Sequence, residues 1–558
     1  MTRLFDEHKI RKTVSLSGVW EMMPDTENIG YSQNWKNGLP AGARKVTVPS
    51  VWNTELDLFG YTGVCWYQKR FRAEDTNALL EFEGVSGRAE VYLDGRKLAA
   101  HKGGFTAFYA PCVLDAGTHL LVVSVDNGYY DDSIPHAKAD WYNYGGIIRN
   151  VTLHCVPDAY ILRSNYEYEL DETLTKASVK AQAAVIAQCD KSVQAVITLD
   201  GNVVSEFTLE LKQGENLITS PEFVINDIEV WQPGAPKLYK ICLTVGKDDL
   251  IDRIGFRKIE IRNREILLNG KPLFFKGVNR HEEHPDWGHA VPPQINARDV
   301  QIIRDLGANI IRGSHYPNSK QFMDMLDENG IMFWSEIPMW QFSKAAMADD
   351  GVIKNGLNMH REMAEQYYNH PSIIIWGLNN ECETTSQEAH ALNLEFYKLL
   401  KRLGGNRLIT YATMLFENDV SLDACDFVSV NKYHGWYESG LDAWEAYIPS
   451  LVKRLDELGM AEKPVVMSEF GAAAIYGYTS FDGNKWSEEY EAETLTKVIK
   501  VCKKTPGVAG AFVWQYADIR SQSNLLRARG FNNKGLVNEF RRPKLAYYAV
   551  KAEFAEKE

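Results

Sequence analysis

The C-terminal part of the chain alternates buried-strand patterns with amphipathic helix patterns, and this alternation constrains the fold most. From about residue 259, eight short apolar runs are separated by longer stretches with apolar residues at helical spacing. Several of these stretches end in glycine, a common helix stop. Eight such repeats predict a (β/α)₈ barrel. The predicted strands are 273–279, 309–313, 331–336, 373–378, 408–413, 427–433, 464–469 and 510–516, and the predicted helices include 297–307, 320–330, 359–369, 393–404 and 451–459.

The residues before this alternation have the pattern of β-structure. Short runs of alternating apolar and polar residues are separated by turn signals, including Asp-Gly pairs at 94–95 and 200–201. Many short strands with frequent turns are typical of antiparallel sandwiches. The predicted fold is therefore multidomain β and α/β, with a jelly-roll sandwich at 1–158, an immunoglobulin-like sandwich at 159–258 and the barrel at 259–558.

The composition excludes several classes of function. The net charge is −13 at pH 7, and the chain has no long Lys/Arg run of the kind that nucleic-acid binders show. No stretch approaches the roughly 18 apolar residues of a membrane span, and the N-terminus lacks the apolar segment of a signal peptide. The 8 cysteines are scattered, which favours free thiols in a reducing compartment. We therefore expect a cytoplasmic protein without a nucleic-acid or membrane partner.

Two of the predicted barrel strands end in a carboxylate. The apolar run 373–376 is followed by Asn380 and Glu381, and the apolar run 465–467 is followed by Glu469. Catalytic groups of a (β/α)₈ barrel lie at the carboxyl ends of its strands. One carboxylate as nucleophile and a second as acid and then base are what a retaining glycosidase needs. The sequence therefore predicts a glycosidase site at this end of the barrel.

Four segments carry a resemblance to a known family. HPSIIIWGLNNE at 370–381, GVNRHEEHP at 277–285, SHYPN at 314–318 and MSEFG at 467–471 strongly resemble the motifs of glycoside hydrolase family 2. That family includes β-galactosidases, β-mannosidases and β-glucuronidases. The resemblance covers nearly the whole chain, and the family's sandwich, immunoglobulin-like and barrel domains match those predicted above.

The resemblance assigns roles to the carboxylates and to polar groups near them. It implies Glu469 as the nucleophile, Glu381 as the acid/base and Asn380 as a donor to the sugar 2-hydroxyl. His281 and His315 follow the first two predicted strands and are expected to bind substrate at the same rim. No metal is predicted, because the HEEH sequence lacks the HExxH spacing and hydrolysis by two carboxylates needs none.

A second signature bears on the identity of the sugar. RARGFNNKG at 527–535 resembles the Asn-x-Lys signature of the β-glucuronidases, here Asn532 and Lys534. A glucuronide carries a C6 carboxylate, which an ammonium and an amide two residues apart can both contact. A lone lysine would otherwise be a solvated loop residue. In the family an arginine near this signature also contacts the carboxylate, and either Arg527 or Arg529 fits that role, with Arg527 favoured.

Aromatic residues and one loop complete the predicted substrate-binding set. VNKYHGWY resembles the glucuronidase segment in which Tyr433 would hydrogen-bond the nucleophile and Tyr437 would help to bind the uronic acid. Trp514 would form a floor for the sugar ring, or else pack at the rim. DWYNYGGIIR is similar to a sandwich loop whose aspartate, here Asp140, binds sugar hydroxyls in the barrel site. The alternative is a surface loop that only closes the sandwich.

The leading hypothesis is a retaining β-D-glucuronidase that hydrolyses small-molecule or oligosaccharide β-glucuronides through a covalent glycosyl-enzyme intermediate. A β-galacturonidase would need the same carboxylate contacts, whereas a β-galactosidase would leave Lys534 without a partner. A catalytically silent carbohydrate-binding protein would be expected to lack one of the two carboxylates, and both are present.

The resemblance also bears on cofactors and assembly. No cofactor is required for the predicted chemistry; some bacterial relatives bind flavin mononucleotide away from the catalytic pocket, and no motif here assigns it. Relatives commonly form tetramers, so a homo-oligomer, tetramer or dimer, is expected. The connection at 339–356 after the third predicted strand is short and resembles members that lack a long active-site loop.

Overall fold

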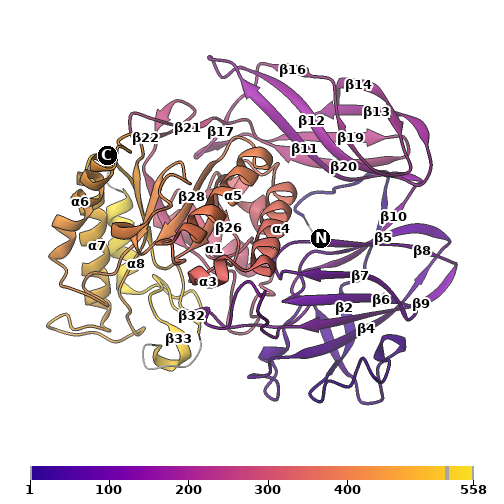
Figure 1. Ribbon diagram of the computed structural model, residues 1–558, viewed down its shortest axis with the longest axis horizontal. Helices are drawn as coiled ribbons and strands as arrows, with labels where there is room; N and C mark the ends of the chain where they lie inside the picture. The colour runs from indigo at the N-terminus through magenta and orange to yellow at the C-terminus, as the bar shows by residue number, and fades with distance from the viewer. Residues whose placement is uncertain (1–2, 522–526, 556–558) are drawn as a thin grey trace.

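A computed structural model describes residues 3–521 and 527–555 and arranges them as two β-sandwiches beside a barrel (Figure 1). The two sandwiches lie one above the other on the right of this view, and the barrel with its helices fills the left. The predicted fold class, β domains followed by a C-terminal (β/α)₈ barrel, is confirmed.

The first sandwich consists of a four-stranded sheet, β1-β10-β5-β8, and a six-stranded sheet, β3-β2-β4-β9-β6-β7, both antiparallel. Trp20, Trp52 and Leu80 are among the side chains that pack between them. A long connection, residues 127–150, leaves the sandwich between its last two strands. The strands are β1 Lys12–Ser15, β2 Gly18–Pro24, β3 Arg44–Val48, β4 Val64–Ala73, β5 Thr76–Phe82, β6 Arg88–Leu93, β7 Arg96–Lys102, β8 Phe108–Leu114, β9 Gly117–Asp126 and β10 Val151–Val156.

The second sandwich pairs the sheet β14-β13-β19-β20 with a sheet in which β12 contacts β11, β15 and β16. Two small sheets, β17-β18 and β21-β22-β23, connect it to the barrel. The strands are β11 Ala159–Leu170, β12 Lys176–Ala187, β13 Lys191–Leu199, β14 Asn202–Leu211, β15 Gly214–Thr219, β16 Phe223–Asn226, β17 Trp231–Gln232, β18 Ala235–Pro236, β19 Tyr239–Val245, β20 Asp248–Ile254, β21 Ile259–Arg262, β22 Glu265–Leu268 and β23 Lys271–Pro272.

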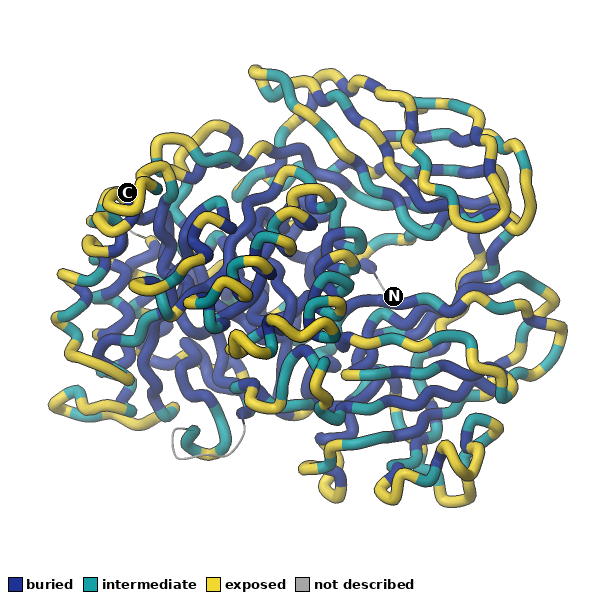
Figure 2. Tube along the Cα trace, in the orientation of Figure 1, coloured by how far each residue is buried: buried dark blue, intermediate teal, exposed yellow. Residues whose placement is uncertain are grey.

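The barrel is a closed parallel sheet in the order β24 to β31, so all eight predicted strands form. Every residue of β27 is buried, which explains its unbroken apolar run, because a barrel strand packs on both faces. Figure 2 shows the same pattern, with dark blue strands inside helices whose outer faces are yellow. The strands are β24 Phe275–Asn279, β25 Ile310–Gly313, β26 Met332–Glu336, β27 Ile373–Asn380, β28 Leu408–Thr413, β29 Val428–Asn431, β30 Val465–Phe470 and β31 Val508–Val513.

Four of the five predicted helices begin earlier than predicted, and the one predicted at 320–330 begins at Lys320 as expected. The helix predicted at 359–369 begins at Asp350, because the side chain of Asp349 accepts hydrogen bonds from the next helical amides and caps the extra turns. The predicted connection at 339–356 is therefore shorter than expected. The helices are α1 Pro293–Leu306, α2 Lys320–Asn329, α3 Lys344–Met347, α4 Asp350–Gln366, α5 Gln387–Leu403, α6 Ala443–Glu457, α7 Glu488–Lys504 and α8 Leu545–Ala555.

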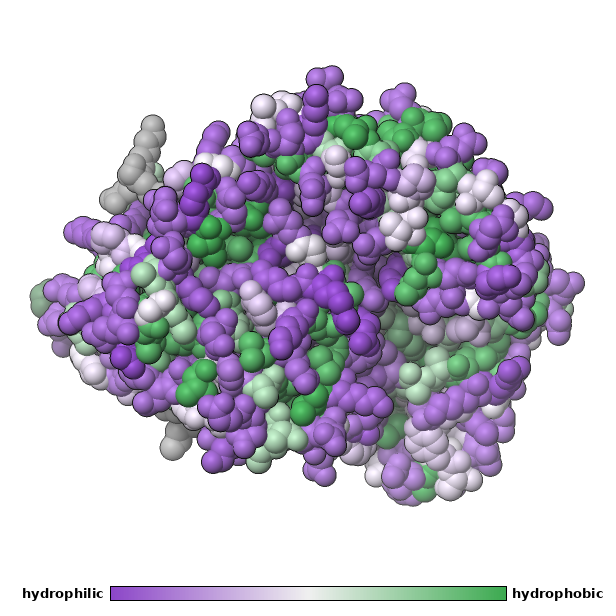
Figure 3. All heavy atoms as spheres, turned by 45° about the horizontal axis from the view of Figure 1, so that its top comes forward, coloured by the Kyte–Doolittle hydropathy of each residue, from purple (hydrophilic) through white to green (hydrophobic). Residues whose placement is uncertain are grey.

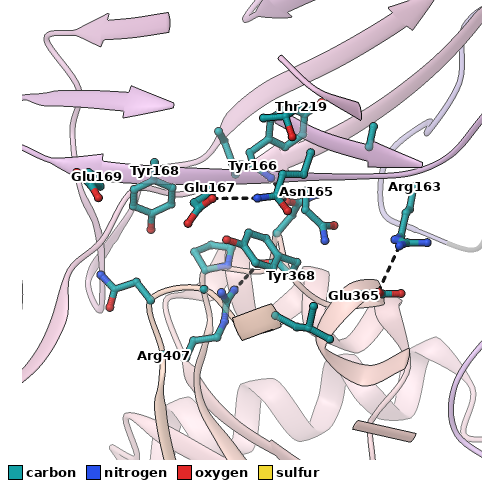
Figure 4. Close-up of a pocket in the computed structure, with 18 of the residues that line it drawn as sticks. Arg163, Asn165, Tyr166, Glu167, Tyr168, Glu169, Thr219, Glu365, Tyr368 and Arg407 are labelled. Atoms are coloured by element: carbon teal, nitrogen blue, oxygen red, sulfur yellow. Dashed lines mark hydrogen bonds and ion pairs between the residues drawn. The ribbon is translucent and has the colours of Figure 1, made fainter. Parts of the chain in front are cut away.

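A groove of about 660 Å³ separates the second sandwich from the amino-terminal end of the barrel (Figure 4). Arg257 and Arg407 lie at its barrel side, and both donate to main-chain carbonyls rather than to carboxylates. Arg257 donates to Pro371 O at 2.8 Å and to Ile373 O at 2.6 Å, and Arg407 donates to Ile373 O at 3.0 Å. These bonds fix the chain that links the sandwich to the barrel.

The visible surface in Figure 3 is mostly hydrophilic, with apolar patches scattered between polar side chains. Within residues 3–521 and 527–555, no helix combines the length and the apolar character needed to cross a bilayer. All 8 cysteines are free thiols, four of them buried and Cys189 exposed.

Candidate active site

The candidate active site is a pocket of about 540 Å³ at the carboxyl-terminal end of the barrel. Residues at or after the end of every barrel strand line it, together with the 127–150 connection of the first sandwich. The pocket brings together all but one of the residues predicted to form a site: Asp140, His281, His315, Glu381, Tyr433, Tyr437, Glu469, Trp514, Arg527, Asn532 and Lys534.

Glu469 lies near the end of β30, and its side chain is almost fully buried. Arg312 Nη1 donates to its Oε1 at 2.7 Å, and Tyr433 Oη donates to its Oε2 at 2.7 Å. Burial raises the pKa of Glu469 to about 8, and the nearby charge of Glu381 adds to this shift, while Arg312 and Tyr433 oppose it. Both hydrogen-bond contacts of Glu469 are donors, and they favour its ionised form.

Glu381 follows β27 directly and is only partly buried, so its carboxyl group faces the open pocket. Gln341 Nε2 donates to its Oε2 at 2.9 Å, and Asn431 Nδ2 donates to its Oε1 at 2.9 Å. Its backbone has φ of 52°, in the left-handed region that a non-glycine residue rarely adopts. Residues held in such conformations cluster at functional sites.

Arg312 links Glu469 to Glu336 and Asn380, and Asn431 links Asn380 to Glu381. Arg312 is fully buried on β25 and donates to Glu469, to Glu336 Oε2 at 3.0 Å and to Asn380 Oδ1 at 2.7 Å. Asn431 Nδ2 also donates to Asn380 Oδ1, at 3.1 Å. Asn380 is the one predicted site residue that does not line the pocket. Its Nδ2 is buried and has no hydrogen-bond partner among the described residues, which leaves a donor beside both carboxylates.

Histidine and tryptophan side chains form one wall of the pocket. His315 stacks on Trp514 with ring centroids 5.3 Å apart, and Trp141 from the first sandwich packs against His281 and His315 at 5.6 and 5.4 Å. Burial lowers the pKa values of both histidines well below the ordinary range, so both rings are neutral. Nε2 of His281 has no hydrogen-bond partner in the described part of the chain. Trp514 both lines the pocket and packs at its rim.

A cationic cluster forms another part of the pocket lining. Lys534 Nζ donates to Tyr437 Oη at 2.9 Å, and Arg527 Nη1 donates to the same oxygen at 3.2 Å. Arg527 also donates to both carboxylate oxygens of Asp140, and Asn532 Nδ2 donates to Asp140 Oδ2 at 3.2 Å. Although burial raises the pKa of Tyr437, the charges of Lys534 and Arg527 outweigh it and lower this pKa. The cluster holds two cations and one carboxylate, so it attracts a second anion.

The structure separates two alternatives that the sequence left open. Arg527 lines the pocket, whereas Arg529 points to Glu539, to which it donates at 3.0 Å. The loop that carries Asp140 is not a surface loop that merely closes the sandwich, because Trp141 is buried against barrel side chains. Asp140 enters the barrel site from the other domain.

Several site residues were not predicted from the sequence. Arg312 and Asn431 form the network beneath the carboxylates, and Gln341 and Met414 line the pocket near Glu381. An arginine within the apolar run NIIRG was the available signal for the first of these. Glu336 and Asp518, which follow the third and eighth strands, lie behind the pocket rather than in its lining, and both are fully buried.

One group of side chains elsewhere has a spacing suitable for a metal ion. Ligand atoms of Asp324, Asp327 and His370 lie within 4.8 Å of one another. Arg3 donates to both oxygens of Asp324, at 2.8 to 3.1 Å, so a guanidinium already supplies positive charge there. None of the three residues lines the candidate active site.

Comparison with known proteins identifies the family. The model described as "Glycosyl hydrolases family 2, TIM barrel domain" matches residues 259–557, and "Glycosyl hydrolases family 2" matches residues 159–257. The chain belongs to glycoside hydrolase family 2. It is therefore a glycoside hydrolase, as the paired carboxylates predicted.

Relatives align over nearly the full chain. A β-glucuronidase of Streptococcus agalactiae is 26% identical over 96% of this chain and 95% of its own length. A solved β-galacturonidase of Eisenbergiella tayi, bound to galacturonate, is 34% identical with a TM-score of 0.92 and covers 99% of both chains. A solved β-glucuronidase of Ruminococcus gnavus is 26% identical with a TM-score of 0.89 and covers 100% of this chain and 99% of its own.

Proposed function

We propose that the chain is a retaining β-D-glucuronidase. The observation that carries this proposal is the convergence of Lys534, Arg527 and Asn532 on the pocket that holds Glu381 and Glu469. The protein as a whole has a charge of −13, so an anionic sugar needs local cations to offset this field. A C6 carboxylate would supply the second anion that the cationic cluster attracts. The β-glucuronidases among the relatives support the same substrate class.

In the proposed mechanism, Glu469 attacks the anomeric carbon while Glu381 gives its proton to the aglycone oxygen, so the glycosidic bond breaks and a glycosyl-enzyme ester forms. The hydrogen bonds from Arg312 and Tyr433 orient Glu469 and stabilise its charge before attack. Once Glu469 is esterified, it no longer carries a negative charge beside Glu381. Glu381 then takes a proton from a water molecule whose oxygen attacks the anomeric carbon; the ester bond to Glu469 breaks, and the sugar leaves with retained configuration. The unpaired Nδ2 of Asn380 is placed to bind the 2-hydroxyl.

A β-galacturonidase is the second candidate. It would use the same cationic cluster and differ only in accepting an axial 4-hydroxyl. The specific observation in its favour is the 34% identity to the Eisenbergiella tayi β-galacturonidase, against 26% to the Ruminococcus gnavus β-glucuronidase.

A parallel assay of p-nitrophenyl β-glucuronide, β-galacturonide and β-galactoside separates these activities. We expect kcat/KM to be highest for the glucuronide and lowest for the galactoside. A higher value for the galacturonide would select the second candidate. Equal kcat/KM values for the galactoside and both uronides would show that the cationic cluster does not select substrates by their carboxylate.

We further propose that the reaction needs no cofactor or metal, because two carboxylates and water supply all its steps. Activity that survives dialysis against a chelator would support this. We also propose a cytoplasmic homo-oligomer, tetramer or dimer; its mass in solution, measured by light scattering, tests the assembly.

A further inference from the structure

We infer that Lys544 positions the loop that carries Asn532 and Lys534, and thereby sets the preference for uronides over neutral sugars. This inference rests on the proposed function of these two side chains as carboxylate contacts. Residues 531–535 are called the clamp loop here; they begin at β33 (Phe531–Asn532), which pairs with β32 (Ile519–Arg520) beside the first sandwich (Figure 1). Lys544 directly precedes α8 and does not line the pocket.

The ammonium group of Lys544 binds three separate segments. Its Nζ donates to Ala474 O at 2.8 Å, to Asn533 O at 2.9 Å and to Asp518 Oδ1 at 3.0 Å. An ammonium has three N–H donors, so each has one partner. Lys544 is fully buried, and therefore water does not compete for these bonds. One side chain thus ties the segment after β30, the segment after β31 and the clamp loop to one point.

Asp518 binds both Lys544 and the clamp loop. Its Oδ1 accepts the Gly535 amide at 2.8 Å as well as the Lys544 ammonium. Glu491 Oε1 lies 3.6 Å from the same ammonium. Burial raises the pKa of Glu491 well above its ordinary value. Asp518 is the carboxylate that hydrogen-bonds the ammonium, and the two side chains form a fully buried ion pair.

Lys544 binds the clamp loop at Asn533, the residue between Asn532 and Lys534. The carbonyl of Asn533 accepts both Lys544 Nζ and the Ala474 amide, the latter at 2.9 Å. The carbonyl of Lys534 accepts the Gln515 amide at 2.7 Å. Without the ammonium, the Asn533 carbonyl would keep one of its two bonds, and only the Gly535 amide would still link the loop to Asp518. The carboxylate contacts would then move, while the groups around Glu381 and Glu469 would keep theirs.

The test is Lys544→Met, with Lys551→Met as the matched control. Lys551 lies on the same helix, is partly exposed and pairs only with Asp305 at 2.7 Å among the interactions described. We expect kcat/KM of Lys544→Met for p-nitrophenyl β-glucuronide to fall about 10- to 100-fold, mainly through KM, because a charge-assisted contact is lost. For p-nitrophenyl β-glucoside, kcat/KM should change by less than about twofold. Lys551→Met should resemble the wild type on both substrates.

The outcomes separate this inference from the proposed function. A wild-type enzyme without any preference for the glucuronide would overturn the proposed function and the inference with it. A wild type that prefers the glucuronide and a Lys544→Met enzyme that keeps this preference would overturn the inference alone. Equal losses on both substrates would also overturn it, because they would show a general structural role.

If Lys544→Met does not fold, a more conservative variant tests the inference. Asp518→Asn keeps the shape of the side chain but turns its ion pair with Lys544 into a weaker hydrogen bond between the ammonium and a neutral amide. We expect a loss of about threefold or more in kcat/KM for the glucuronide only. An unchanged ratio between glucuronide and glucoside in folded Asp518→Asn, checked by circular dichroism, would overturn the inference.

Discussion

The two ends of the barrel each have a hollow lined with arginine and tyrosine side chains, yet only one has the features of an active site. In the groove at the amino-terminal end, Arg257 and Arg407 donate to main-chain carbonyls. At the other end, Arg527 in the pocket lining and Arg312 behind it donate to carboxylates, and Asn380 Nδ2 has no hydrogen-bond partner among the described residues. The groove is the larger of the two, at about 660 against 540 Å³.

Shifted pKa values alone do not identify the active end of the barrel. In the groove, burial and the neighbouring charge of Arg257 lower the pKa of Arg407 to about 9. In the pocket, burial and the charge of Glu381 raise the pKa of Glu469 to about 8. Buried ionisable groups are perturbed at both ends. What distinguishes the active end is that two carboxylates, two cations and unpaired donors face one open space.

Glu469→Ala should have the largest effect. Without the nucleophile no glycosyl-enzyme can form, and we expect kcat for p-nitrophenyl β-glucuronide to fall about 10⁴-fold or more. A matched control in the groove is Glu365→Ala, which removes a carboxylate that pairs with Arg163 at 3.3 Å. The control should retain wild-type kcat. Comparable losses in the two variants would contradict the assignment of chemistry to one end of the barrel.

Lys534→Ala should act on substrate choice rather than on chemistry. It removes an almost fully buried ammonium from the cationic cluster, so kcat/KM for the glucuronide should fall about 10- to 100-fold while that for the glucoside changes little. The two substrates are assayed side by side at several concentrations. A variant with the parent's ratio between them would remove the selectivity argument.

The pH profile should reflect the raised pKa of Glu469. Its folded-state pKa is raised to about 8, so the carboxyl group is largely protonated below that pH and ionised above it. Because Glu469 must be ionised to attack the anomeric carbon, kcat/KM should rise with pH up to about 8, approaching tenfold per pH unit on the acid side. A profile that stays flat from about pH 5 to 8 would show that Glu469 is already ionised at the lower pH.

Arg402→Ala should have the smallest effect. Arg402 is an exposed residue at the rim of the groove, and its removal should change kcat/KM by less than about twofold. The same kinetic assay measures this. A tenfold loss would link the groove to catalysis and break the contrast between the two ends.

The sequence was most informative where one local pattern has one structural outcome. Apolar runs such as that of β27 have to be buried on both faces, and a carboxylate that directly follows such a run lies at the strand's carboxyl end. The strands of the barrel and the places of Glu381 and Glu469 were therefore predictable. The residues proposed to bind the sugar carboxylate were predictable only through the resemblance to a known family.

The remaining features depend on contacts between distant segments. Arg312 is recognisable as a site residue only once β24, β25, β27 and β30 bring Asn279, Asn380 and Glu469 around it. Lys544 looks like a solvent-exposed lysine before a helix until the fold buries it. The choice between Arg527 and Arg529 depends on the backbone of the connecting turn, in which Arg529 has φ of 63°.

The ion pair between Asp140 and Arg527 joins residues 387 positions apart in the chain. A nascent polypeptide that has already folded its sandwiches and most of its barrel still lacks the partner of Asp140. The proposed preference for acidic sugars would therefore arise only when synthesis is almost complete, and fragments truncated before this region should lack that preference.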